Sequence, residues 1–100
     1  METTITREPG RVIVAIEGRV DTASSAELNE VLAPLAQETG VELVLDCEEM
    51  DYISSSGLRV LLGTQKEVTA HAGSLVVKNV QEAVKSVFNI TGFSSFLDIR

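Results

Sequence analysis

The sequence predicts an α/β protein, with one domain over residues 1–100 and a mainly parallel or mixed sheet of four to five strands with helices packed against it. Its 100 residues, 44% of them hydrophobic, suit one packed core. Short apolar segments alternate along the chain with segments whose apolar residues recur at helical spacing. Because parallel strands need such intervening crossovers, this alternation favours a largely parallel sheet.

The N-terminal part begins with two predicted strands that form a hairpin. Residues 2–7 are rich in threonine and suit an edge strand, and Pro9-Gly10 is typical of a turn. Residues 12–16 are apolar on both faces and predict an interior strand. A helix is predicted next, beginning with a capping box formed by Ser24 and Glu27.

Pro34 and Gly40 limit that helix. Proline removes a backbone donor and is expected to kink or weaken the helix, and glycine favours a helix end. The later predicted elements are an interior strand at 41–47, a helix from Leu58 to about 72–73, a strand at 74–79, a helix at 81–89 and a last strand at 96–99.

The charge balance argues against several classes of protein. The chain has fifteen acidic and eight basic residues, a net charge of −7. An acidic chain without a basic stripe repels phosphate backbones, so no direct nucleic-acid binding is expected. The longest apolar run, residues 12–16, is far too short to insert into a membrane. Cys47 is the only cysteine, which excludes an internal disulfide and fits a cytoplasmic location.

The sequence also argues against catalysis. If Ser56 opens the second helix and His71 closes it, about 22 Å separates them, whereas a general base must approach to about 3 Å. Cys47 fits a small core residue better than a nucleophile. The acidic residues within 48–51 fit a solvated turn better than a metal site, which needs further ligands. No common glycine-rich phosphate loop is present. We therefore predict no enzyme, no cofactor and no metal.

The most informative segment is the serine run before the second helix. One of the serines must cap this helix, and the spacing favours Ser54 as the cap, with Ile53 and Leu58 in the two positions of a hydrophobic staple. This assignment leaves Ser55 and Ser56 in the first turn without a capping duty.

Gly57 is a poor residue for a first helical turn, costing up to about 1 kcal/mol against alanine. It makes sense if another molecule approaches the backbone there. The simpler alternative is an ordinary serine-rich turn between a strand and a helix. The predicted location favours a site, because open α/β sheets place their sites beyond the carboxyl ends of strands.

Three segments, in order along the chain, resemble the STAS domain family, the fold of bacterial anti-sigma factor antagonists. Residues 51–62, Asp-Tyr-Ile-Ser-Ser-Ser-Gly-Leu-Arg-Val-Leu-Leu, resemble its signature. Residues 17–21 resemble its strand-end turn with an acidic residue before the first helix, and residues 84–93 its late helix and Thr-Gly turn. The resemblance covers most of the chain.

The resemblance implies a phosphorylation-switched regulator of transcription that works by partner switching. Unphosphorylated, such a protein binds an anti-sigma factor that is also a serine kinase, and thereby frees a sigma factor; a serine phosphatase reverses the modification. The implied phosphorylation site is Ser56, with Ser55 as the secondary candidate because Ser54 stands where relatives often carry aspartate. The implied partner-binding residues are Asp21, Ser54, Ser55, Ser56, Gly57 and Leu58.

Two further expectations concern assembly. Many relatives continue into another helix beyond the position of Arg100, and a dimer contact could form there, so we expect a monomer or a weak homodimer.

The alternative function is a STAS subunit of a lipid-transport or other membrane-transport complex, acting as a non-enzymatic interaction module. A nucleotide or small-molecule sensor is a third reading.

Overall fold

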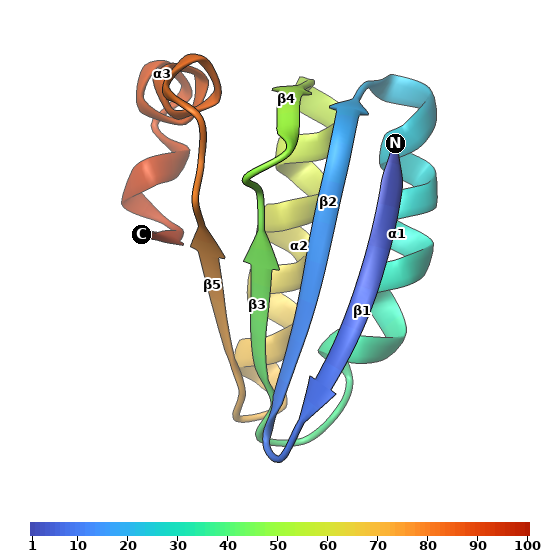
Figure 1. The fold of residues 1–100 in the computed structure, drawn as a ribbon. Helices are drawn as coiled ribbons and strands as arrows, with labels where there is room; N and C mark the ends of the chain where they lie inside the picture. Colours follow the sequence, from blue (N-terminus) through green and yellow to red (C-terminus); the bar gives the residue numbers. More distant parts are fainter.

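Six strands form one mixed sheet, and the helices α1 and α2 both lie against the same face of it (Figure 1). The structure is a computed structural model that describes residues 1–100. The elements in chain order are β1 (Glu2–Glu8), β2 (Arg11–Val20), α1 (Thr22–Ala36), β3 (Glu42–Asp46), β4 (Met50–Ile53), α2 (Ser55–Ala70), β5 (Ser74–Lys78), α3 (Glu82–Thr91), a 3-10 turn η1 (Phe93–Ser95) and β6 (Asp98–Ile99).

The order of the strands is β1-β2-β3-β5-β6, with β4 pairing with β2 beyond the end of β3. β1 is antiparallel to β2, and the other pairs are parallel. The α/β class, the N-terminal hairpin, the edge position of the first strand and the interior position of β3 are therefore confirmed. No helix is long and apolar enough to span a membrane.

The strand β4 was not predicted, and it raises the number of strands from the expected four to five to six. It has only four residues, and the two in the middle, Asp51 and Tyr52, are exposed. Such a short segment carries no readable periodicity. It forms because β2 is ten residues long and extends past β3, which leaves its last residues free to pair with another strand.

The core lies between the sheet and the two helices. Alternate residues of β2, Val12, Val14 and Ile16, point into it and are at most 2% exposed. Leu28 and Leu32 of α1 meet them at helical spacing and are fully buried. Burying each such side chain contributes about 1.5–3 kcal/mol, so this cluster of 22 buried residues fixes how the helices lie on the sheet.

The predicted start of α1 is wrong in register. The helix begins at Thr22 with Asp21 as its N-cap, so Ser24 is the third helical residue and not the cap. A capping box is present, but Asp21 and Ser24 form it, and Glu27 takes no part. α1 ends at Ala36, two residues beyond Pro34.

Other boundaries also differ from the prediction, among them the start of α2, which lies at Ser55 and not at Leu58. Gly40 does not end α1, but has a φ of 71° in the turn that leads to β3. The predicted last strand at 96–99 is reduced to Asp98–Ile99, because a 3-10 turn precedes it. The last helix, α3, packs against β4 and lies above the end of β5 (Figure 1).

Candidate functional site

The starts of α1 and α2 lie side by side because their preceding strands are paired. Val20, the last residue of β2, is opposite Ile53, the last residue of β4. The N–H of Ser54 donates a 2.8 Å hydrogen bond to the carbonyl oxygen of Val20. Since both strands are parallel, both helices begin at the same edge of the sheet, at the top of Figure 1. The serine run and Asp21 therefore share one end of the molecule.

Ser54 is the N-cap of α2, as predicted. Its hydroxyl oxygen accepts a 3.1 Å hydrogen bond from the N–H of Gly57, and its carbonyl accepts one from the N–H of Leu58. Ile53 and Leu58, the two staple residues, are both buried in the main core cluster. The cap and the staple together fix where α2 begins.

The other two serines do not cap the helix. Ser55 is exposed and Ser56 is half-buried, and neither hydroxyl makes a hydrogen bond within the chain. Both lie in the first turn of α2, where backbone N–H groups lack partners within the helix. The sequence predicted that Ser54 alone caps α2 and that Ser55 and Ser56 do not, and the hydrogen bonds of the structure agree with this prediction.

Gly57 is required by the fold itself, which corrects the expectation that it permits the approach of another molecule. A Cβ at this position would stand 2.7 Å from Ile53 Cγ1 and 2.9 Å from Val20 Cγ1. The glycine therefore lets α2 pack closely on the paired ends of β2 and β4. Leu58 is only 1% exposed. Both residues were expected to contact a partner, but both face the core, which leaves Asp21 and the three serines at the surface.

Asp21 has a structural role as the cap of α1. Its carboxylate accepts a 2.9 Å hydrogen bond from the N–H of Ser24, and the Ser24 hydroxyl also lies 2.9 Å from it. These two bonds from Ser24 hold the pKa of Asp21 below its ordinary value, and the N–H of Ala23 and the charge of Arg19 add to the effect. Asp21 therefore carries a fixed negative charge beside the serine run.

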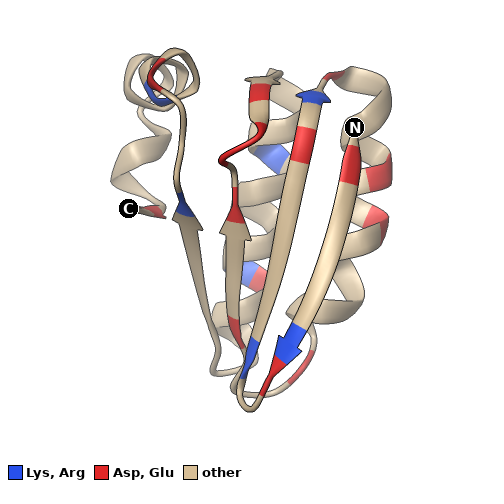
Figure 2. Cartoon of the chain, viewed as in Figure 1, with Lys and Arg blue, Asp and Glu red and all other residues tan.

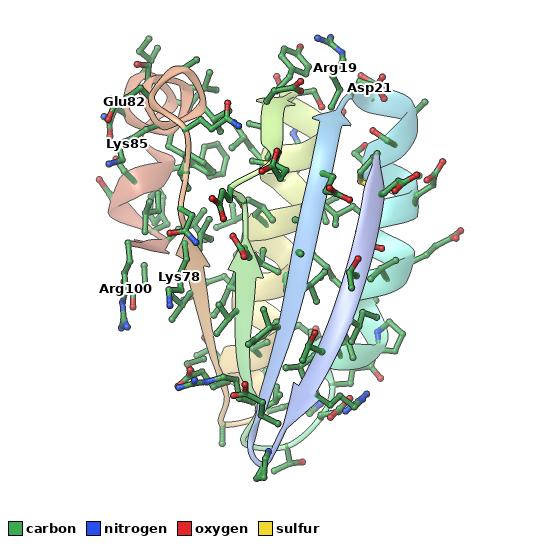
Figure 3. All side chains as sticks on the ribbon, viewed as in Figure 1. Arg19, Asp21, Lys78, Glu82, Lys85 and Arg100 are labelled. Carbon is green, nitrogen blue, oxygen red and sulfur yellow. The ribbon has the colours of Figure 1, made fainter.

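A stacked pair beside the serines was not predicted from the sequence. The guanidinium of Arg19 lies 4.1 Å from the centroid of the Tyr52 ring, in the range of a cation–π contact. The two residues are opposite each other on β2 and β4, and both are exposed. Figure 3 shows Arg19 and Asp21 together at the end of β2. Only the unpredicted pairing of these strands reveals the contact.

The remaining reactive side chains are far from this edge or inert. Burial, with a smaller contribution from Asp46, raises the pKa of the Cys47 thiol to about 12, so the thiol stays protonated. His71 caps the C-terminal end of α2, the opposite end from Ser56. Asp21 and the three serines line none of the four surface hollows.

The fold and the site define a small α/β domain with an exposed pair of helix starts. The STAS domain family matches residues 2–100, and the chain belongs to this family. The anti-sigma-B factor antagonist of Bacillus subtilis is 38% identical over 86 residues, which cover 86% of this chain and 78% of that protein. BtrV of Bordetella bronchiseptica is 34% identical over 99 residues, which cover 99% of this chain and 85% of that protein.

Solved structures show the same fold at lower identity. SpoIIAA in its unphosphorylated form matches with a TM-score of 0.76 at 17% identity, covering 99% of this chain and 87% of that one. The Bacillus cell fate determinant SpoIIAA in its phosphorylated form matches with a TM-score of 0.75 at 18% identity, covering 99% and 91%. The predicted membership of the STAS family and its fold are therefore confirmed.

Gly57→Ala and Gly63→Ala test the close packing beneath the serine run. Gly57→Ala should lower the free energy of unfolding by about 1–3 kcal/mol, because the new methyl group overlaps Val20 and Ile53. Gly63 is exposed in the same helix with open space around it, so Gly63→Ala should raise the free energy by about 0.5–1 kcal/mol. Urea unfolding measures both. Equal stabilisation by the two changes would contradict the packing.

Asp21→Asn tests the charge on the cap of α1 while keeping an oxygen acceptor. Because the folded-state pKa of Asp21 is lowered, its ionised form stabilises the fold above the unfolded value of about 3.9, and this stability is lost as the pH falls through the folded-state pKa. The parent should have a higher urea midpoint than the variant at pH 7, and the two midpoints should converge as the pH falls below the unfolded-state value of about 3.9 and through the lowered folded-state pKa. If the difference between the two urea midpoints did not depend on pH, the charge of Asp21 would not contribute to the stability of the fold.

Proposed function

We propose that this protein is an anti-sigma factor antagonist switched by phosphorylation of Ser56. In the unphosphorylated state it binds an anti-sigma factor through the edge that carries Asp21 and the serines, and this binding frees a sigma factor for transcription. The observation that carries the proposal is that only Ser54 of the three serines accepts the capping hydrogen bond of α2. Ser54 caps α2, which leaves the Ser56 hydroxyl without a partner at an accessible helix start.

The relatives support this function. The Bacillus subtilis protein at 38% identity is named an anti-sigma-B factor antagonist, and SpoIIAA is described as an anti-sigma factor antagonist with a phosphorylated form. The proposal extends both properties to this chain. A kinase activity in the anti-sigma factor would supply the phosphate, and a serine phosphatase would remove it. The chain itself acts by binding and catalyses neither step.

The first turn of α2 suits the modification chemically. A bond forms between the Ser56 Oγ and the γ-phosphorus of the kinase's ATP, the bond from that phosphorus to ADP breaks, and a base of the kinase takes the hydroxyl proton. The product adds a charge of about −1.5 to −2. The free N–H groups and the helix dipole at this end of α2 stabilise such a charge, so the fold should not rearrange.

The switch then acts at the interface with the partner. A partner surface that fits a neutral hydroxyl would enclose the phosphate beside the fixed negative charge of Asp21. Burying an uncompensated charge costs several kcal/mol, and about 4 kcal/mol weakens binding roughly a thousandfold. A local change of charge is therefore sufficient, without a large conformational change.

The alternative, a STAS subunit of a membrane-transport complex, would need no modification at Ser56. The uncommitted hydroxyl gives no support to that alternative, whereas an acceptor serine needs a free hydroxyl. The sensor reading gains no support either, because no surface hollow is lined by the serine run.

Modification and binding can be tested together with the anti-sigma factor and ATP. The parent and Ser55→Ala should each gain one phosphate, which mass spectrometry places on residue 56, and Ser56→Ala should gain none. Calorimetry without ATP should give similar affinities for the parent and Ser56→Ala. Ser56→Asp should bind at least about tenfold more weakly, because one carboxylate imitates the phosphate only in part.

Two results would contradict the proposal. A phosphate on Ser55 that survives in Ser56→Ala would move the acceptor by one residue. Equal binding by the parent, Ser56→Ala and Ser56→Asp would place the interface elsewhere on the molecule.

A further inference from the structure

Arg59 is the only arginine whose guanidinium has no partner in the structure. Arg7 pairs with Glu38, Arg11 with Glu42, Arg100 with Asp98, and Arg19 stacks on Tyr52. Arg59 is exposed, and it takes part in no ion pair, hydrogen bond or cation–π contact within the chain. In a chain of net charge −7, a free arginine is the exception.

The position of Arg59 relates it to the serine run. It lies three residues after Ser56 and four after Ser55 on the continuous helix α2. Side chains at these two spacings are neighbours on a helix surface, with Cβ atoms about 5–6 Å apart. A guanidinium at this spacing can reach a phosphate carried by Ser56 without any movement of the backbone.

The start of α2 carries no acidic residue. α1 has the carboxylate of Asp21 as its cap and α3 has Glu82 in its first turn, whereas α2 has only Ser54. A cation near a helix N-terminus is disfavoured by the helix dipole, so Arg59 does not help the unmodified helix. The basic residues of α2 are Arg59 and Lys66. The positive segments of this helix are blue in Figure 2.

We propose that Arg59 is the counter-ion that the chain itself provides for the phosphate on Ser56. The inference rests on the proposed function, because it takes Ser56 as the acceptor. An arginine can donate two parallel hydrogen bonds to a phosphate. Arg59 thus draws the modified side chain along α2 and holds it in one orientation. It is a positioning residue and takes no part in the phosphoryl transfer.

Other charges act on the same phosphate. The elements packed against α2 are α1, β4 and β5. The ionisable groups on them or capping them are Asp21, Glu27 and Glu30 of α1, Asp51 and Tyr52 of β4 and Lys78 of β5. Asp21 and Asp51 favour the protonated phosphate and thus oppose Arg59. Arg19, on β2 near Asp21, is the rival cation, but its guanidinium is already stacked on Tyr52.

The test uses the full chain with phosphoserine installed at position 56 during synthesis, so that it depends on neither a kinase nor a partner. A ³¹P NMR titration gives the second pKa of the phosphate. Arg59→Gln should raise this pKa by about 0.3 units, the size expected for an exposed pair at this spacing. Arg59→Lys should restore most of the difference. Lys66→Gln, an exposed cation ten residues after Ser56 on the same helix, is the matched control and should leave the pKa unchanged.

Three results would overturn the inference: no shift in Arg59→Gln, an equal shift in Lys66→Gln, or a larger shift in Arg19→Gln. None of them bears on whether a kinase modifies Ser56. Conversely, a result in which Ser56 gains no phosphate on incubation with the anti-sigma factor and ATP would count against the proposed function alone. The pKa values measured by the titration would still test the role of Arg59.

Discussion

The pairing of the last residues of β2 with β4 is the constraint on which the surface of this protein depends. Val20 and Ile53 lie opposite each other, and the N–H of the next residue, Ser54, bonds to the carbonyl of Val20. This short parallel ladder ends two strands at the same level, so that two helices start side by side. Gly57 allows the second helix to sit directly on the ladder, because any larger residue would overlap Val20 and Ile53. The position of the serine run is thus a consequence of packing.

At this edge, residues of similar chemistry have different tasks. Asp21 and Ser54 bond to the backbone of their own helices, and those bonds hold them in place. Ser55 and Ser56 have no such bonds, so their hydroxyls are available for chemistry. A modification on an uncommitted side chain changes the charge of the surface without removing a cap. This separation allows a protein to be switched while its stability stays nearly constant.

The sequence was most informative where it carries an apolar run or a clear capping pattern. The N-terminal hairpin, the interior strand β3 and the serine cap of α2 were predicted, because residues 12–16 and the segment from Ile53 to Leu58 carry clear patterns. The cap of α1 was misplaced because Asp21 and Ser24 are both good capping residues, and spacing alone cannot decide between them. β4 was missed because its four residues carry no pattern. The roles of Gly57 and of the Arg19–Tyr52 pair follow from β4, so neither could be predicted without it.

The central claim is that Ser54 caps α2 and that Ser56 is free for modification, and urea unfolding of two alanine variants tests it most directly. Ser54→Ala removes the acceptor for the N–H of Gly57 and should cost about 1 kcal/mol. Ser56→Ala removes a hydroxyl without a partner and should change the free energy of unfolding by less than about 0.5 kcal/mol. A loss in Ser56→Ala equal to or larger than that in Ser54→Ala would contradict the account, because Ser56 would then be a structural residue.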